Sequence, residues 1–151
     1  MNKPDSLRRA LVAAVPALGA TPDKLSVRIE QGTIAATGTL SASFEYRYVA
    51  RVLVTDFTGD TDPPFVALIE WVRANQPDLV TNPAAQASGI VFEAIAREPG
   101  ATDLSIRLAL TESVVVTTGP DGQRVVTHVD DTQVDARNTL TWVAVPQRGA
   151  A

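Results

Sequence analysis

The stretch that decides the fold begins at residue 43 and reads Ser43-Phe44-Glu45-Tyr46-Arg47-Tyr48-Val49-Ala50-Arg51-Val52-Leu53-Val54. Every second residue from Phe44 to Val54 is apolar or aromatic. This period of two, built from aromatic and β-branched residues, predicts a β-strand. The other set of positions starts charged but turns apolar at Val49 and Leu53. We therefore expect a central strand whose second half is covered on both faces.

An acidic turn and a helix are predicted directly after this strand. Residues 55–62 are dense in turn formers, so the chain should break there. Thr61 or Asp62 suits the cap of a helix, and Pro63 suits its first position. The helix should end before Pro77, because proline disfavours helix in the residue before it. Its apolar stripe, spaced i, i+3, i+4, i+7, consists of Phe65, Leu68, Ile69 and Val72.

The remaining segments predict one further helix and several strands joined mostly by hairpin-scale connections. The helix is expected at 4–15, and the strands at 25–30 with a bulge and continuation to 37, 90–96, 104–116, 123–129 and 139–145. Loops are expected at 38–42 and at 82–89, with one helical turn as an open alternative in the second. The predicted fold class is α+β, a mostly antiparallel (mixed) β-sheet with two main α-helices packed on it. We expect one domain over residues 1–145 and a flexible tail over 146–151.

Composition excludes several classes of site. The chain has 151 residues, enough for one domain, and 45% of them are hydrophobic, which is enough for an ordinary core. It has no cysteine, so disulfides, thiolate metal sites and cysteine nucleophiles are excluded. The net charge of −4 disfavours specific nucleic-acid binding, which normally needs a basic face. No apolar run approaches the length needed to span a bilayer.

The amino-terminal segment allows two interpretations. Arg8-Arg9 followed by an apolar run and the small residues near Ala20 resemble a short export signal. The same residues form a helix with one apolar face, and Asp5 and Pro16 count against export. We expect the helix. Its apolar face would consist of Leu7, Leu11, Ala14, Val15 and Leu18.

The search for catalytic chemistry finds no assembled site. His128 is the single histidine, on a polar strand, and is expected to be a surface residue. The G-x-S-x-G, Walker and glycine-rich dinucleotide motifs are absent. Asp56, Asp60 and Asp62 could hold Ca²⁺ or Mg²⁺, but their spacing does not fit an EF-hand. A structural role in the turn and helix cap is the favoured alternative, so no metal, cofactor or catalytic residue is assigned, and we expect no enzyme.

Several large or charged side chains are better candidates for contacts between proteins. Trp71 lies beside the predicted stripe, which fits either core packing or an interface. Exposed arginines could pair with the acidic turn of a neighbouring subunit, among them Arg51. The assigned candidate interface residues are Arg8, Arg9, Arg47, Asp56, Phe57, Asp60, Asp62 and Trp71.

Five short motifs, in order along the chain, resemble the tail completion protein R family of contractile-tailed temperate phages. They cover about residues 1–113, and beyond Gly119 no resemblance is seen. The motifs are Lys3-Pro4-Asp5-Ser6-Leu7-Arg8-Arg9-Ala10-Leu11, Ser43-Phe44-Glu45-Tyr46-Arg47-Tyr48, Val54-Thr55-Asp56-Phe57-Thr58-Gly59-Asp60, Asn75-Gln76-Pro77-Asp78 and Leu110-Thr111-Glu112.

The resemblance implies a structural virion protein with a tail-terminator-like fold. Members of such a family cap the head-proximal end of the tail, stop polymerisation and allow the head to join. Because contractile tails have six-fold symmetry, the resemblance implies a hexameric ring. The implied partners are the tail tube protein, the neck or head-completion protein and, as an open alternative, the tail sheath protein, with assembly in the host cytoplasm. Genomic DNA would pass through the lumen without specific binding, and no membrane is implied.

Two other functions stay open at this point. The chain could be a neck adaptor or another minor tail subunit, which differs from a terminator only in its position along the particle. A metal-dependent enzyme that uses Asp56, Asp60 and Asp62 is the less favoured alternative.

Overall fold

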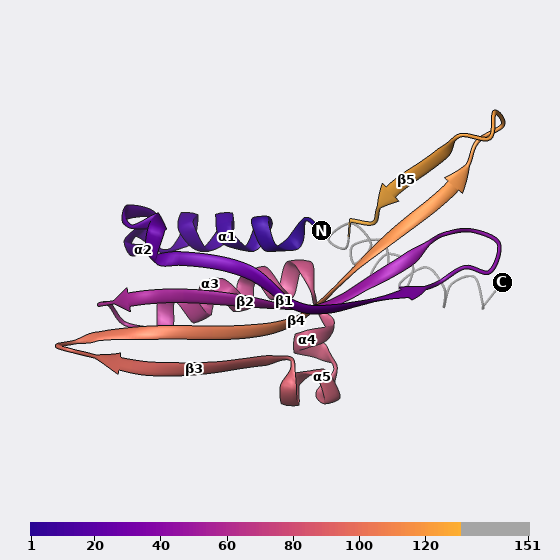
Figure 1. The fold of residues 1–151 in the computed structure, drawn as a ribbon. Helices are drawn as coiled ribbons and strands as arrows, with labels where there is room; N and C mark the ends of the chain where they lie inside the picture. Colours follow the sequence, from indigo (N-terminus) through magenta and orange to yellow (C-terminus); the bar gives the residue numbers. More distant parts are fainter. Residues whose placement is uncertain (131–151) are drawn as a thin grey trace, which may run out of the picture.

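The fold consists of one sheet with helices packed against it (Figure 1). A computed structural model describes residues 1–130, so the strand expected at 139–145 and the tail expected at 146–151 lie outside the described part. The helices are α1 (Lys3–Ala14), α2 (Pro16–Ala20), the 3-10 turn η1 (Pro22–Lys24), α3 (Asp62–Asn75), α4 (Asp78–Thr81) and α5 (Pro83–Ser88). The strands are β1 (Leu25–Ala36), β2 (Phe44–Phe57), β3 (Ile90–Arg97), β4 (Ala101–Thr118) and β5 (Arg124–His128).

The sheet has the strand order β1-β2-β4-β3, and every pairing between the described strands is antiparallel. The predicted α+β class is therefore confirmed. β5 pairs only with the last five residues of β4, from Val114 to Thr118. This hairpin, residues 114–128, projects from the body of the molecule and is called the arm below (Figure 1).

The alternation predicted for β2 is confirmed. Tyr48, Ala50, Val52 and Val54 are all buried, and together with β4 they face α1 and α3 across one core. This side of the sheet is called the helix face. The expectation that the second half of β2 is covered on both sides is wrong, because the core lies on the helix face alone. Val49 on the opposite, open face is only half-buried.

The amino-terminal segment forms part of this core. Leu7 and Leu11 of α1 are buried, and Val15 and Leu18 continue the same apolar face into α2. Pro16 ends the first helix and starts the second, because its ring fits the first turn but not the interior of a helix. The one member of the predicted face that stays exposed is Ala14. No helix among residues 1–130 is long and apolar enough to cross a membrane.

The second main helix, α3, has the expected bounds but a different buried side. Leu68 and Val72 are buried as predicted, whereas Ile69 is 39% exposed. Trp71 is buried instead, because α3 packs against α1 as well as against the sheet, and its indole N–H donates to Ser6 Oγ at 3.0 Å. The spacing of apolar residues in the sequence cannot show that α3 also packs against α1. This second contact changes which side of the helix is buried.

The turn expected at residue 55 begins later than predicted. β2 continues to Phe57, and the pairing with β4 shifts between Val54 and Phe57. Asp56 lies in this bulge with φ 52°, a conformation that aspartate tolerates better than most residues. Its backbone N–H donates to Asp103 Oδ1 at 2.9 Å. The first residues of the predicted turn, 55–57, therefore form a bulge at the end of β2, and the chain leaves the strand only after Phe57.

The middle of β4 has no strand on the side opposite β2. β3 pairs with β4 up to Leu108 and β5 begins at Val114, so the edge between them must find other hydrogen-bond partners. Gln76 Oε1 accepts from the Thr111 backbone N–H at 3.0 Å, and Lys3 Nζ donates to the Thr111 carbonyl at 2.7 Å. Both side chains are buried.

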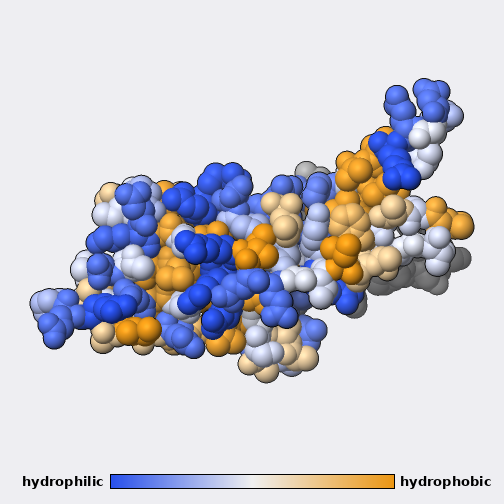
Figure 2. Space-filling model, in the orientation of Figure 1, coloured by the Kyte–Doolittle hydropathy of each residue, from blue (hydrophilic) through white to orange (hydrophobic). Residues whose placement is uncertain are grey.

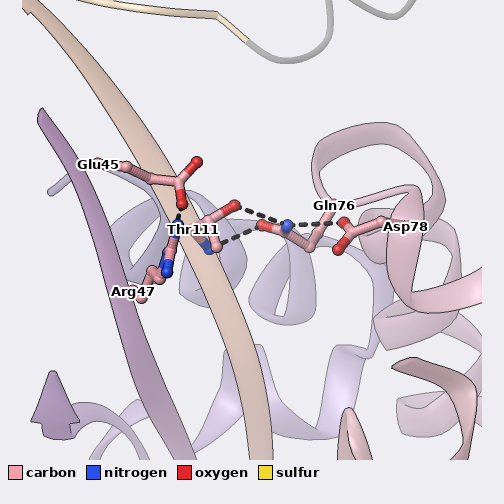
Figure 3. A network of polar contacts seen from close by, with 5 residues as sticks. All are labelled: Glu45, Arg47, Gln76, Asp78 and Thr111. Carbon is pink, nitrogen blue, oxygen red and sulfur yellow. Dashed lines mark hydrogen bonds and ion pairs between the residues drawn. The ribbon is translucent and has the colours of Figure 1, made fainter. Parts of the chain in front are cut away.

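Gln76 is the centre of this seal (Figure 3). Its Oε1 also accepts from Lys3 Nζ at 2.7 Å, and its Nε2 donates to Asp78 Oδ1 at 2.7 Å and to Thr111 Oγ1 at 3.0 Å. The network joins the end of α3, the start of α1 and the unpaired edge of β4. We call it the β4 seal.

We predict that Gln76→Ala destabilises the protein more than an ordinary surface substitution. The variant leaves a buried backbone N–H and a buried lysine short of an acceptor, which costs about 1–3 kcal/mol. Urea unfolding followed by circular dichroism measures this. Gln123→Ala, at an exposed turn, is the matched control and should change stability by less than about 0.5 kcal/mol. Equal losses for the two variants would contradict the seal.

Candidate docking surfaces

The structure places the candidate interface residues in three separate regions. Arg8 and Arg9 lie on α1, where Arg8 Nη2 donates to the Pro22 carbonyl at 3.3 Å. Arg47 lies on the open face and pairs with Glu45 at 2.7 Å (Figure 3). The remaining residues belong to the acidic turn and to α3. Within residues 1–130 no ion pair joins these arginines to the acidic turn, so a contact between the two sets stays a prediction about neighbouring subunits.

The acidic turn is organised by its own hydrogen bonds. Asp60 Oδ1 accepts from the Asp62 backbone N–H at 3.0 Å, and neither Thr61 nor Asp62 caps α3 with its side chain. The boundary of the helix was predicted correctly, but Asp60 performs the capping role. Among residues 1–130 no group of three acidic or histidine side chains is close enough to hold a metal ion.

Two of the candidate residues contribute to the core. Phe57 and Trp71 are only 6% and 5% exposed. Of the two interpretations of Trp71, the structure therefore agrees with core packing. A role of either residue in an interface would act through the position of its neighbours, since little of its own surface is accessible.

A charge cluster crosses the open face of the sheet. Arg51 of β2 and Arg107 of β4 are direct cross-strand neighbours, an arrangement that is unfavourable for like charges. Glu30 lies where the pairing of β1 with β2 shifts, between Ile29 and Gln31. From there its carboxylate reaches Arg51 at 3.2 Å and Arg107 at 3.0 Å. The bulge therefore directs the Glu30 carboxylate toward the side chains of both arginines.

The pKa of the Glu30 carboxyl is lowered by this arrangement. The hydrogen bond from Arg107 is the main cause, partly opposed by desolvation, and the charges of Arg107 and Arg51 add to it. The pKa of Asp103 is also lowered, first by the hydrogen bond from the Asp56 backbone and then by Arg97. The open face is therefore a mixed surface of paired charges rather than a basic patch.

A shallow hollow of about 470 Å³ lies beside this cluster. It is lined by β1, β2 and β4 on one side and by α4 and α5 on the other, with Arg47 and Asp78 among its charged residues. It holds no histidine and no close pair of carboxylates. Its lining therefore contains no pair of groups placed for acid–base catalysis.

The arm and the neighbouring β1–β2 loop expose large apolar side chains. Val125 and Val126 of β5 are 49% and 60% exposed, and Leu40 at the loop tip is fully exposed. Figure 2 shows the apolar surface gathered where the arm leaves the body. Large exposed apolar patches commonly mark interaction sites, so this surface is a candidate for one. Sequence reasoning missed this surface, because alternating valines also fit an ordinary half-buried strand.

A buried tyrosine–carboxylate pair supports the base of the arm. Tyr48 Oη donates to Glu112 Oε2 at 2.5 Å, and the Asn2 backbone N–H donates to Glu112 Oε1 at 2.7 Å. Burial, and then the hydrogen bond and charge of Glu112, raises the pKa of Tyr48. The pair ties the start of the chain to β2 and β4.

Comparison with known proteins gives a consistent result. Residues 1–132 match the family described as P2 phage tail completion protein R (GpR). The chain is 47% identical over 116 residues to the "Tail completion protein R" of Escherichia phage P2, which covers 77% of this chain and 75% of that protein. No solved structure matches the chain.

We predict that Tyr48 makes stability fall at alkaline pH. Because its pKa is raised in the folded state, its contribution is complete below the unfolded pKa of about 10 and is lost as pH rises through the folded pKa. Tyr48→Phe should therefore be less stable than wild type near neutral pH, by about 1 kcal/mol. Between pH 9 and 11, however, its free energy of unfolding should fall less than that of wild type. Urea titrations at each pH measure this.

Tyr46→Phe is the matched control for this experiment. Within residues 1–130 the Tyr46 hydroxyl makes no hydrogen bond, so Tyr46→Phe should cost less stability near neutral pH than Tyr48→Phe. If Tyr48→Phe lost as much stability as wild type between pH 9 and 11, the buried pair would not be responsible.

We predict an acid-dependent contribution from Glu30. Its lowered pKa means that the contribution is present above the unfolded pKa of about 4.3 and is lost as pH falls through the folded value. Glu30→Gln should destabilise the protein at pH 7, less so at 1 M salt, and the difference from wild type should shrink below pH 4. Glu98→Gln, in an exposed turn, is the control. A difference that persists at acid pH would contradict the role of the charge.

Proposed function

The chain belongs to the P2 phage tail completion protein R family, and from this membership we propose that it forms the ring that ends a contractile tail on the head-proximal side. Its role in tail completion is structural, as a component of the virion tail. The observation that carries the proposal is the family match, which spans every described element from α1 to β5.

A tail needs such a component because of its symmetry. In a stack of rings, the top of each ring fits the bottom of the next, so the contact never closes by itself and growth continues. A terminator binds the last ring with one surface and presents a different surface on the other side. A ring of six subunits of 16.0 kDa matches the tube and multiplies a weak contact by avidity.

The surfaces of the molecule support this proposal. The open face carries paired charges and a shallow hollow, whereas the arm carries exposed valines. Two surfaces of different chemistry suit two different neighbours. The proposed partners are further copies of this chain, the tail tube protein and a neck or head-completion protein, with the sheath as an additional neighbour.

The charge of the chain suits the passage of DNA. With a net charge of −4, the ring would not hold a phosphate backbone that has to move through its lumen. We propose assembly in the host cytoplasm, where tails form, and incorporation into the virion at the head-proximal end.

A position in the neck is the second candidate within the same structural class. A neck adaptor would share the fold and the exposed arm, and would differ only in which partner it binds first. A metal-dependent hydrolase is not favoured, because the three aspartates do not converge on one point within residues 1–130.

We predict that the purified protein binds one end of tail tubes taken from phage that lack it. Electron microscopy should show a ring at that end, and the capped tails should then accept heads. Without the protein, tails should be headless or overlong. Binding to heads but not to tails would identify a neck adaptor instead. A monomer that binds neither, together with normal tails in its absence, would refute both functions.

A further inference from the structure

One edge of the sheet is open. Among the described strands, none pairs with the outer edge of β3. Its pairing with β4 runs without a break from Ile90 to Arg97, and it contains no proline or bulge. Val91, Phe92 and Ile95 are each about half exposed, on both faces of the strand. Such an edge is a template for another strand, and proteins normally block it.

The opposite edge of the sheet shows what a blocked edge looks like. β1 is interrupted by the bulge at Glu30, which disturbs the regular row of backbone groups. Its open face there is charged rather than apolar, since Glu30 binds two arginines. β3 has no such bulge, and its two charged residues, Glu93 and Arg97, alternate with Val91 and Ile95 on the open face.

The helix beside β3 adds apolar surface to this edge. Phe65 of α3 contacts Phe92 with ring centroids 5.1 Å apart, in an edge-on arrangement. Phe65 packs partly against the core and partly against Phe92, so it extends the apolar surface of β3 on the helix face. We call β3 together with Phe65 the β3 edge.

The arm has the matching property. A two-stranded hairpin alone is at best marginally stable in water, and β5 pairs with β4 alone among the described strands. All five residues of β5 are exposed, including Val125 and Val126. The arm therefore lacks a third strand on its outer side, and the β3 edge lacks a neighbour.

These two edges cannot meet within one chain. Val91 is paired with Arg107 of β4, and Val126 with Val116 of the same strand. Nine residues of extended strand separate the two partners, a distance of roughly 30 Å. Any contact between the two edges therefore joins different molecules.

We propose that β5 of one copy adds to the β3 edge of a second copy as an antiparallel strand. The charges select the register. If Arg124, which has no acidic partner in residues 1–130, lies opposite Glu93, then Val125 falls opposite Phe92 and Val126 opposite Val91. This register forms a cross-strand ion pair and places Val125 and Val126 against Phe92 and Val91.

The contact joins two different surfaces of identical molecules. Such head-to-tail contacts generate rings when the rotation closes. The inference therefore deepens the proposed ring and rests on it for the biological role, but it makes a separate claim about which edges meet.

Cysteine cross-linking tests the register directly, because the chain has no cysteine of its own. Full-length Val91→Cys and full-length Val126→Cys are mixed, with tails from phage that lack the protein present, and oxidised mildly. Facing residues of an antiparallel pair have Cα atoms about 4.5–5.5 Å apart, within the range of a disulfide. We expect a covalent dimer on a non-reducing gel from the mixture, and none from either variant alone.

The matched control is Ile95→Cys mixed with Val126→Cys. This pair is four residues out of register, about 13 Å away, and should not cross-link efficiently. Equal yields from Val91→Cys and Ile95→Cys, dimers from a single variant alone, or no dimer at all would each overturn the proposed contact. If rings formed on tails but no cross-link appeared, the proposed function would stand and the proposed contact would be wrong. If the cross-link formed but the protein did not bind tails, the contact would stand and the proposed function would be wrong.

A charge exchange provides a second readout. Glu93→Arg or Arg124→Glu alone should lower the yield of the Val91–Val126 cross-link about two- to fivefold, as expected for an exposed ion pair. The two exchanges combined should restore it. If the combined variant gave no higher cross-link yield than the single variants, the ion pair would not be part of the contact.

Discussion

The structure depends on satisfying both edges of a single long strand. β4 spans 18 residues, and β2 covers one of its sides over most of that length. The other side is shared between β3, β5 and the β4 seal, in which Gln76 and Lys3 take the place of a missing strand. A buried backbone group without a partner is costly, so the gap can exist only because side chains fill it. The break in pairing is also what separates the arm from the body.

The motifs that carry the family resemblance meet at this position. Lys3, Tyr48, Gln76 and Glu112 come from four different motifs, and all lie in the seal or in the adjoining pair of Tyr48 with Glu112. The motif around Asp56 instead shapes the bulge at the other end of β2. The resemblance is thus carried by residues that hold the framework together. The surfaces with uncovered apolar side chains lie elsewhere, on the arm and the β3 edge.

The sequence predicted those elements whose pattern is local. Alternation in β2 identified its buried face, and the bounds of α3 followed from Pro63 and Pro77. The buried side of α3 was missed in part, because its contact with α1 depends on tertiary packing. Asp56 suggested a turn because a bulge and a turn require the same residue types. The β4 seal joins positions 108 residues apart in the sequence through single side chains, and a periodic sequence pattern cannot predict such a contact. Likewise, candidate interface residues could be chosen from the sequence only by their residue type. The open sheet edges could be recognised only once the strand order was known.

The position of Lys3 and Asn2 has a consequence for biosynthesis. Both bind residues 111 and 112, so the amino terminus cannot reach its final place until most of the chain has left the ribosome. The first residues to be translated therefore make these contacts only after residue 112 has been synthesised. A shorter nascent fragment lacks the complete β4 seal, so the start of α1 is not yet fixed to β4.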